Sequence, residues 1–337
     1  MLITADRLFD GREFREPGAV LVRGETVVAV GASIDAEAAR TIDLGDATIL
    51  PGFIDLHVHA EAQMLRGGVT TVRDLAAPLS TLRPAGRHRG LRVLMAGPMV
   101  AVAGGYPSTV WGSSIALNVR DADDARRAVR LLARRGAAVI KVSLEPGNGA
   151  WPMLSATVVR AIVDVAHRHD LTVTAHAMGP EGIRRALDRG VDELAHVPCG
   201  ATEELMRGIV EQQIEVVGTL HVVQVRSGGC GHVASRLVGL GARLLYGSDV
   251  GNQGIPLGID VSELRLLRGA GLRPEAVLAA ATSRAGEQIG LSPLGTLAEG
   301  APADVIAVPG DARALRDDLG SPLVVLGGGR IVVAPNR

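Results

Sequence analysis

The 337-residue sequence lacks several features that would point to particular classes of protein. No apolar run approaches the roughly 20 residues that a membrane-spanning helix needs, and no basic segment followed by an apolar stretch opens the chain, so no secretory signal is expected. A net charge of -1 provides no basic surface for nucleic acid. Cys199 and Cys230 are too few for a disulfide framework and form no Cys-x-x-Cys pair. These absences predict a soluble protein of a reducing cytoplasm whose partner is a small molecule.

Lysine is nearly absent too, since Lys141 is the single lysine among 35 basic residues. It follows an apolar run, residues 137–140. A partly buried lysine can lose its proton and become a nucleophile, which arginine cannot do at any working pH. The neutral amine can then react with carbon dioxide to form a carbamate, an anionic group able to bridge two metal ions. Taken alone, however, Lys141 fits better as an ordinary strand-end lysine whose head reaches solvent.

Five short apolar runs each end in side chains that can bind a metal. The first run ends in His57 and His59, and because residues two apart on a strand point to the same face, their imidazoles can bind one ion. The other four runs end in Lys141, His176, His196 and Asp249. A lone His-x-His pair is weak evidence, but five such strand ends indicate one metal site.

From Pro51 onward the sequence alternates strands with helices. We expect strands over 53–59, 69–74, 92–98, 138–144, 172–177, 192–197, 215–222 and 243–249. Helices are expected over 121–136, 153–169, 180–189, 201–213, 232–240, 260–270 and 273–289, the first with Asp121 as its N-cap. Eight strands close a parallel barrel, so the predicted fold class is α/β, with a (β/α)8 TIM barrel.

Both ends of the chain have a different pattern. β-branched runs separated by glycine-containing turns fill the first fifty residues, and similar runs return from residue 303. We therefore predict a small β-sandwich domain made of residues 1–50 and 294–337, with the barrel inserted as residues 51–293. Active sites of such barrels lie at the C-terminal ends of the strands, so the metal-binding side chains should converge. Imidazoles, a carbamate and a carboxylate would hold two divalent ions, zinc by default.

Together these motifs resemble the amidohydrolase superfamily, specifically its binuclear branch with a carbamylated lysine on strand four. The sequence is most similar to the prolidase and dipeptidase-like group, which is related to imidazolonepropionase. The motifs that carry this resemblance are 51–59 (Pro-Gly-Phe-Ile-Asp-Leu-His-Val-His), 67–74, 104–105 and 295–304. The resemblance implies a ligand set in which His57, His59 and Asp249 bind the more buried ion, His176 and His196 bind the more exposed ion, and carbamylated Lys141 bridges both. It also implies N-acyl amino acid or dipeptide substrates that are cut at the amide bond.

Asp249 is the expected general base. Two ions about 3.5 to 4 Å apart lower the pKa of a water between them, and one ion polarises the substrate carbonyl. Close to that water, Asp249 can take its proton and pass it to the leaving amine. The alternative is that Asp249 only fixes the geometry of the metal site.

Three further residues are candidate substrate contacts. Tyr106 follows a Gly-Gly pair and could donate a hydrogen bond to the developing oxyanion, or simply line the pocket. His221 ends the expected seventh strand and could contact the substrate directly or through water. His232, in a glycine-rich turn that opens a helix, could approach the pocket from above.

One departure from the family concerns the segment after His59. Only residues 60–68 separate it from the second strand, so its helix should be about two turns long, since nine residues rise only ~14 Å. The shortening would open the pocket to bulkier substrates or leave a gap for a neighbouring subunit, and we expect a homo-oligomer. Two other functions stay open: a mononuclear deaminase or cyclic-amide hydrolase with a structural Lys141, and a non-catalytic binding protein that kept the barrel.

Overall fold

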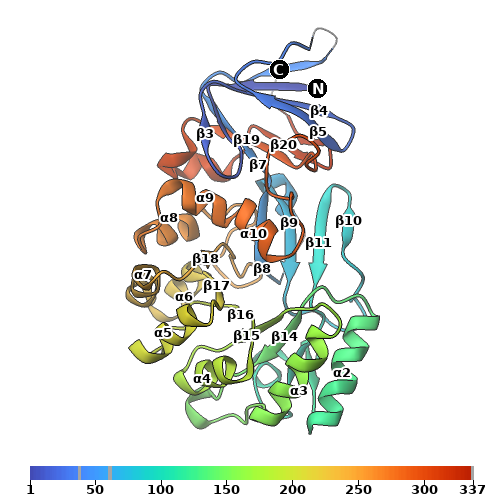
Figure 1. Cartoon of the computed structure of the whole chain (residues 1–337), viewed down its shortest axis with the longest axis vertical. Coiled ribbons are helices and arrows are strands. Elements are labelled where there is room, and N and C mark those ends of the chain that lie inside the picture. The colour runs from blue at the N-terminus through green and yellow to red at the C-terminus, as the bar shows by residue number, and fades with distance from the viewer. Residues whose placement is uncertain (37–38, 60–62, 335–337) are drawn as a thin grey trace.

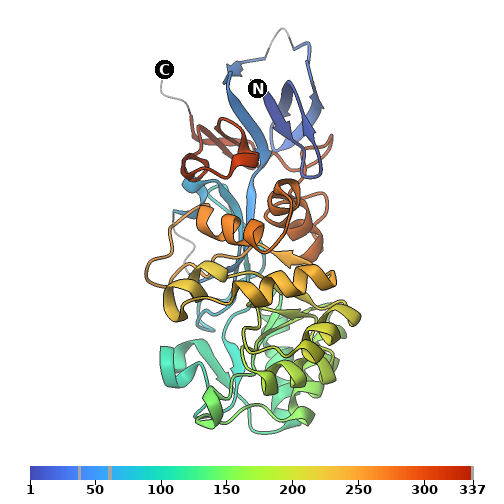
Figure 2. The ribbon, with the colours of Figure 1, turned by 90° about the vertical axis from the view of Figure 1, so that its left-hand side faces the viewer.

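The computed structural model describes residues 1–36, 39–59 and 63–334 of the chain. A small β part lies at one end and contains the N-terminus, and a larger part with helices around strands fills the rest (Figure 1). The same two parts are separate in the perpendicular view (Figure 2). In the part of the chain that is described, no helix is both long enough and apolar enough to cross a membrane.

Two sheets form the β part. The first has the strand order β5-β4-β1-β6, with β1 at Leu2–Ala5, β4 at Gly18–Arg23, β5 at Thr26–Gly31 and β6 at Thr41–Asp43. The second has the order β21-β20-β19-β7-β2-β3, with β2 at Arg7–Phe9, β3 at Phe14–Arg15, β7 at Ala47–Pro51, β19 at Val305–Pro309, β20 at Val324–Gly327 and β21 at Arg330–Val333. Apolar residues of both sheets, among them Ile3, Val20, Ile49 and Val305, share one buried core. Strands from both ends of the chain therefore build one sandwich.

Eight parallel strands surround the centre of the larger part. They are β8 at Phe53–Val58, β9 at Val69–Asp74, β11 at Leu91–Met95, β14 at Ile140–Ser143, β15 at Val173–His176, β16 at Glu193–Leu194, β17 at Glu215–Val217 and β18 at Leu244–Leu245. The Ala138 N–H donates to the Met95 carbonyl at 2.8 Å, which connects β11 to β14. The Asp249 N–H donates to the His57 carbonyl at 2.8 Å, which joins the last strand to the first. These contacts close the ring and confirm the predicted (β/α)8 barrel with a small β-sandwich.

Three short strands extend the barrel, and helices cover it. The strands are β10 at Gly86–His88, β12 at Met99–Ala101 and β13 at Ala116–Asn118. The helices are α1 at Ser108–Trp111, α2 at Ala122–Arg134, α3 at Ala156–His167, α4 at Pro180–Arg189, α5 at Glu203–Glu211, α6 at Leu220–Ser227, α7 at Gly231–Leu240, α8 at Val261–Gly269, α9 at Pro274–Ala280 and α10 at Ser283–Gln288. Short 3-10 helices lie at Met64–Gly67 (η1), Ser113–Ile115 (η2), Gly147–Gly149 (η3), Ala312–Ala314 (η4) and Asp317–Gly320 (η5).

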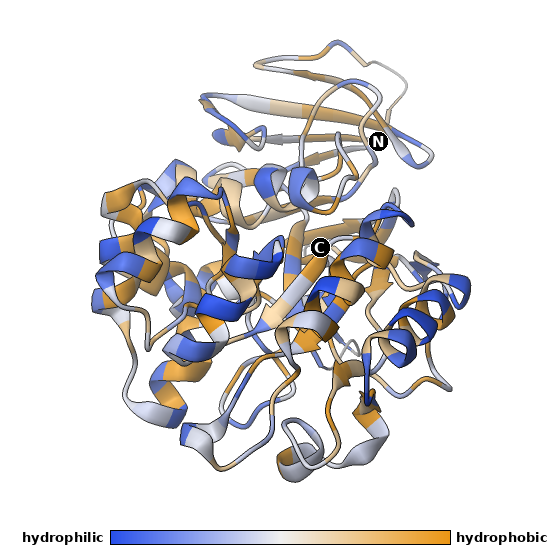
Figure 3. Cartoon of the chain, turned by 60° about the horizontal axis from the view of Figure 1, so that its bottom comes forward, coloured by the Kyte–Doolittle hydropathy of each residue, from blue (hydrophilic) through white to orange (hydrophobic). Residues whose placement is uncertain are grey.

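Local chemistry accounts for the helix positions. The Asp121 carboxylate accepts the Asp124 N–H at 2.8 Å and caps α2, as the sequence predicted. Pro180 begins α4, where its missing N–H costs no hydrogen bond, and Gly190 ends it with a left-handed backbone. Polar residues cover the outer faces of the helices while the central strands are apolar (Figure 3). The helices thus cover the apolar strands of the barrel, and polar side chains occur at the strand ends.

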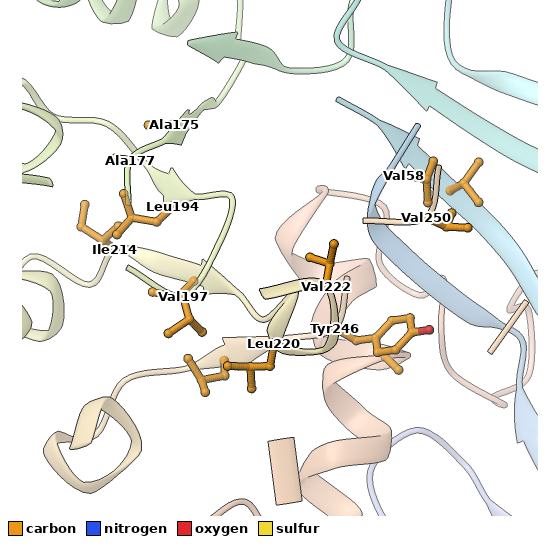
Figure 4. Close-up of a cluster of buried hydrophobic side chains, with 14 of the residues drawn as sticks. Val58, Ala175, Ala177, Leu194, Val197, Ile214, Leu220, Val222, Tyr246 and Val250 are labelled. Atoms are coloured by element: carbon orange, nitrogen blue, oxygen red, sulfur yellow. The ribbon is translucent and has the colours of Figure 1, made fainter. Parts of the chain in front are cut away.

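Apolar packing supports the strand ends that matter for the site. Side chains from β15, β16 and the segments after β17 and β18 pack in one cluster that includes Leu194, Val197 and Tyr246 (Figure 4). Val58 and Val250 also belong to it and form an isolated bridge between their backbones. Val58 stands between two histidines and Val250 follows Asp249, so this packing fixes the backbone of the candidate ligands.

Two expected elements differ in the structure. The seventh strand, expected to reach residue 222, ends at Val217, and α6 begins at Leu220. Thr219 has a left-handed backbone (φ 49°) that turns the chain between them. The expected helix over 273–289 is divided into α9 and α10, because Thr282 leaves helical geometry (φ -135°, ψ -100°). The first error arises because apolar residues continue on both sides of the turn at Thr219.

The described part of the segment after His59 contains a shorter helix than expected. Residues 60–62 lie outside the described residues, and the part that follows forms only η1, a 3-10 helix of four residues, in place of two helical turns. The domain boundaries at residues 50 and 294 stay predictions.

Cys199 and Cys230 form a disulfide, with their Cα atoms 5.4 Å apart. Cys199 follows β16, and Cys230 directly precedes α7, so the bond ties two loops that are separated by 31 residues in the sequence. The count of two cysteines gave no sign of this pairing, because it depends on where the barrel places the loops. The cysteine argument for a reducing compartment is therefore lost.

Candidate metal centre

The first histidine pair lies at the end of β8 beside Asp249. His57 Nε2 is 3.2 Å from His59 Nε2, and the Asp249 Oδ1 atom is 3.5 Å from the first and 3.1 Å from the second. His57 Nδ1 is 2.9 Å from the Ala195 carbonyl oxygen, which can only accept, so Nδ1 carries the hydrogen and Nε2 presents a lone pair. Candidate ligand atoms from these three residues lie within 4.8 Å of one another. They could hold one ion.

The second pair comes from β15 and the end of β16. His176 Nδ1 lies 2.9 Å from His196 Nε2. The other ring nitrogen of His196 contacts the Thr219 hydroxyl at 2.8 Å, which fixes the ring with Nε2 toward His176. Asp249 Oδ2 is 4.0 Å from His196 Nδ1, so the carboxylate lies near both histidine pairs.

Burial and nearby charge favour the neutral form of three of these imidazoles. Burial lowers the pKa of His57, His176 and His196 well below the usual value, and neighbouring positive charges lower it further. Neutral imidazole is the form that binds a metal. The rings are therefore in the state that ligation requires.

Lys141 is fully buried on β14, next to Thr174 of β15. Its Nζ atom has no hydrogen-bond partner among the described residues. Burial lowers the pKa of Lys141 to about 7; the Asp249 and Glu193 charges partly oppose this, and the Arg73 charge adds to it. An unpaired ammonium is costly to bury, so a large fraction of the amine is in its neutral, nucleophilic form at pH 7 to 8. Lys141 alone had favoured a head group that reaches solvent, and that prediction is wrong because the side chain is buried.

Asp249 is held in an unusual backbone conformation. Its φ is 57°, in the left-handed region that few residues other than glycine adopt. Buried Oδ1 of Asp249 lacks a hydrogen-bond donor in the described part of the chain. A Cβ at Gly251 would come within 2.8 Å of the His59 Cβ, so a glycine is needed where the chain passes the ligands. An acceptor oxygen without a donor, beside two imidazole nitrogens, fits a bound cation.

Asp55, which the sequence analysis did not single out, accepts hydrogen bonds from the segments that carry His57 and Asp249. One carboxylate oxygen accepts the His57 N–H at 3.1 Å and the Ser248 N–H at 3.0 Å, and the other accepts the Ser248 hydroxyl at 2.6 Å. Burial raises the pKa of Asp55 to about 7, although these hydrogen bonds oppose the rise. Period-two alternation places Asp55 on the same face as His57, and this could have identified it.

Two of the three candidate substrate contacts have defined surroundings. The Tyr106 ring stacks on His176 with ring centres 4.3 Å apart, and its hydroxyl accepts the Trp111 indole N–H at 3.2 Å. His221 does not end a strand but lies in the first turn of α6, where its Nδ1 is 2.7 Å from the buried Asp260 carboxylate. His232 is exposed near the beginning of α7.

Sequence reasoning also missed a polar pair that borders the site. The Arg226 Nη1 atom donates to Asn252 Oδ1 at 2.8 Å, and Asn252 Nδ2 donates to the Asp249 carbonyl at 2.9 Å. The Arg226 guanidinium lies over the Trp111 ring, 5.1 Å from its centre. Neither residue follows a strand directly, so no motif pointed to them.

The chain is similar to several known proteins. The chain is 33% identical over 222 residues to ochratoxinase of Aspergillus niger, which covers 59% of this chain and 46% of that protein. It is 27% identical over 322 residues to adenine deaminase of Deinococcus radiodurans, which covers 85% of this chain and 54% of that protein. The chain thus spans about half the length of these curated relatives.

Among solved structures, a Xaa-Pro dipeptidase with methionine bound in its active site superimposes with a TM-score of 0.88. The match covers 99% of both chains at 23% identity, so it shows a shared fold. The model of the Amidohydrolase family matches residues 48–332, from the last strand before the barrel to the last strand of the sandwich. The chain belongs to the amidohydrolase family.

Proposed function

We propose that the protein is a metal-dependent hydrolase that cleaves the amide bond of a dipeptide or an N-acyl amino acid. One observation carries the proposal: two pairs of histidines lie near Asp249, in a barrel whose buried Lys141 amine has no hydrogen-bond partner among the described residues. Similarity to ochratoxinase and to the fold of a Xaa-Pro dipeptidase supports the class of bond.

The donor set fits two divalent ions. His57, His59 and Asp249 would hold one ion, His176 and His196 would hold the other, and carbamylated Lys141 would be a ligand of both. Zinc accepts nitrogen and oxygen ligands of this kind. The carbamate would put an anion in place of the buried amine, and attraction to the cations would offset the cost of burying its charge.

Bound divalent ions supply a water of lowered pKa and polarise a carbonyl oxygen. Asp249 would accept the proton of that water during attack and deliver it to the leaving amine. Burial raises the pKa of Tyr106 to about 12, so its hydroxyl keeps its proton and can donate to the carbonyl oxygen as negative charge develops. Asp55 and Thr219 would hold the ligands in place without touching the substrate.

The remaining candidate contacts are proposed as secondary. The Nδ1 atom of His221 contacts the Asp260 carboxylate, so Nε2 of His221 would be the atom that contacts the substrate. His232 would act only from the rim of the site. A homo-oligomer and a cytoplasmic location also stay predictions.

A second candidate function is deamination by a mononuclear site, which the similarity to adenine deaminase favours. A deaminase of this superfamily would use a glutamate shortly after His176 to move protons. Glu181 is the residue available, but its carboxylate pairs with Arg185 at 2.9 Å on the surface of α4. The buried Lys141 would also have no role. Amide hydrolysis is therefore the better proposal.

A hydrolysis screen of N-acyl amino acids and dipeptides, with metal analysis of the same preparation, tests the proposal. We expect release of the free amino acid together with close to two ions per chain. Ammonia release from adenine without any amide hydrolysis would favour deamination instead.

A further inference from the structure

Arg226 connects to the candidate metal centre from one side through aromatic residues. Its guanidinium lies 5.1 Å from the centre of the Trp111 ring. The Trp111 indole donates to the Tyr106 hydroxyl at 3.2 Å, and the Tyr106 ring stacks on His176 at 4.3 Å. A continuous series of contacts therefore runs from Arg226 to a candidate ligand.

A second series of contacts connects Arg226 to the other half of the centre. The guanidinium donates to the Asn252 side chain at 2.8 Å, and that side chain donates to the backbone carbonyl of Asp249 at 2.9 Å. Asp249 is the candidate general base. Arg226 is thus positioned from both sides by neighbours of the proposed ligands.

Among the described residues, no acid balances the charge of Arg226. No carboxylate in residues 1–36, 39–59 and 63–334 lies within ion-pair distance of it, although many other arginines of the chain have such a partner. A guanidinium has five N–H donors, and the structure gives one of them to Asn252. Its contacts with Trp111 and Asn252 keep this charge beside the metal centre.

The surroundings of Arg226 suit recognition of an anion attached to an apolar group. Trp111 and Val225 are large apolar residues that stay 46% and 52% exposed. Stacking on Trp111 restrains the planar guanidinium, so less freedom is lost when it binds. The remaining N–H groups form a fork that matches the two oxygens of a carboxylate.

We propose that Arg226 binds the free α-carboxylate of the substrate and so selects N-acyl amino acids and dipeptides over neutral amides. The inference rests on the proposed function, because that function supplies a substrate with a carboxylate two bonds from the amide nitrogen. Trp111 and Asn252 are positioning residues for Arg226.

The test compares Arg226→Gln and Arg226→Lys with Arg130→Gln, a control at an exposed arginine of α2. The substrates are the best N-acyl amino acid from the screen and its carboxamide. For Arg226→Gln, we expect kcat/KM for the acid to fall about 100-fold, mainly through KM, while the carboxamide changes less than about threefold. Arg226→Lys keeps the charge without the fork, so its loss should be smaller. The control should match wild type, and metal content should not change in any variant.

Binding without turnover separates failure of this inference from failure of the proposed function. Calorimetric titration with L-methionine and L-methioninamide should show tighter binding of the acid to the metal-loaded wild type, and Arg226→Gln should abolish the difference. If nothing is hydrolysed but this difference holds, the carboxylate site stands and the hydrolase proposal fails. Equal hydrolysis of acid and carboxamide, equal binding of both probes, or binding of neither would overturn the carboxylate site.

Discussion

Replacing Lys141 by arginine should destroy the metal centre in a chain that otherwise uses arginine for every basic position. Lys141 is completely buried and its amine has no partner in the described structure. Arginine cannot lose its proton to react with carbon dioxide, and it would place a fixed positive charge beside two cations. A solvent-exposed lysine would predict the opposite, an arginine variant with nearly unchanged activity.

The pKa of Lys141 sets the size of the expected effect on the free energy of unfolding. A fall from 10.5 to about 7 corresponds to about 5 kcal/mol of bias against the charged form in the folded protein. An arginine must remain charged there at every pH. Relative to the uncharged Lys141→Met, the free energy of unfolding of the metal-free arginine variant should therefore fall by about this amount, a large part of the 5 to 15 kcal/mol typical of a domain. The deficit relative to wild type should be small near pH 7 and grow as pH rises. Lys141→Met keeps the length without the charge, so it should fold normally but lose the shared ligand.

The pH dependence has a definite sign. The folded pKa of Lys141 lies below the unfolded value, so between about pH 7 and 10.5 the unfolded chain binds more protons. The metal-free wild type should therefore gain stability relative to Lys141→Met as pH rises. From pH 7.5 to 9.5 the gain should be about 2 to 3 kcal/mol. Comparison with Lys141→Met cancels the contributions of the other buried groups.

Urea unfolding at these two pH values, metal analysis and amide hydrolysis measure the three effects. Lys141→Ala provides a further control, because added acetate or propionate could enter the space and restore an anionic ligand. An arginine variant with normal activity and two bound ions would end the carbamate hypothesis. A pH dependence identical in wild type and Lys141→Met would show that the buried amine does not titrate as argued.

Three other predictions follow from the metal centre. Elemental analysis should find close to two zinc-like ions per chain, and at most one ion after reconstitution with zinc and bicarbonate would refute the binuclear site. Asp249→Asn should keep much of the metal but lose nearly all turnover, and activity within tenfold of wild type would exclude Asp249 as the general base. Thr219→Val should weaken metal binding about 10- to 100-fold in a competitive chelator titration, because His196 loses its hydroxyl partner. Thr174→Val is its control, since the Thr174 hydroxyl is buried without a partner in the described structure; an equal effect in both would reject the role of Thr219.

The sequence predicted the parts of the structure that depend on local pattern. Alternating strands and helices with metal-competent strand ends were enough for the barrel, because the fold itself brings such ends together. Capping chemistry was enough for the bounds of α4, from Pro180 to Gly190. These features are determined by residues that are close to one another in the sequence.

The missed features depend on contacts between distant residues. The turn at Thr219 was hidden because valines occur on both sides of it, as strand residues and as helix residues. Nothing in the sequence links Cys199 to Cys230, or Arg226 to Trp111, until the loops are placed. Asp55 differs, because its position within the strand could have identified it. The assignment of ligands to individual ions stays a proposal that the geometry supports.

The position of β7 has a consequence for how the chain is made. Strand β7, buried along its whole length, lies between β2 and β19, and only Gly52 separates it from β8, the strand that leads to His57. Because β19 follows the barrel in the sequence, the whole barrel must be synthesised before β19 can pair with β7. Until then β7 presents an apolar edge that other chains can join. A nascent or truncated chain that stops before Val305 should aggregate through this edge, even when its barrel sequence is complete.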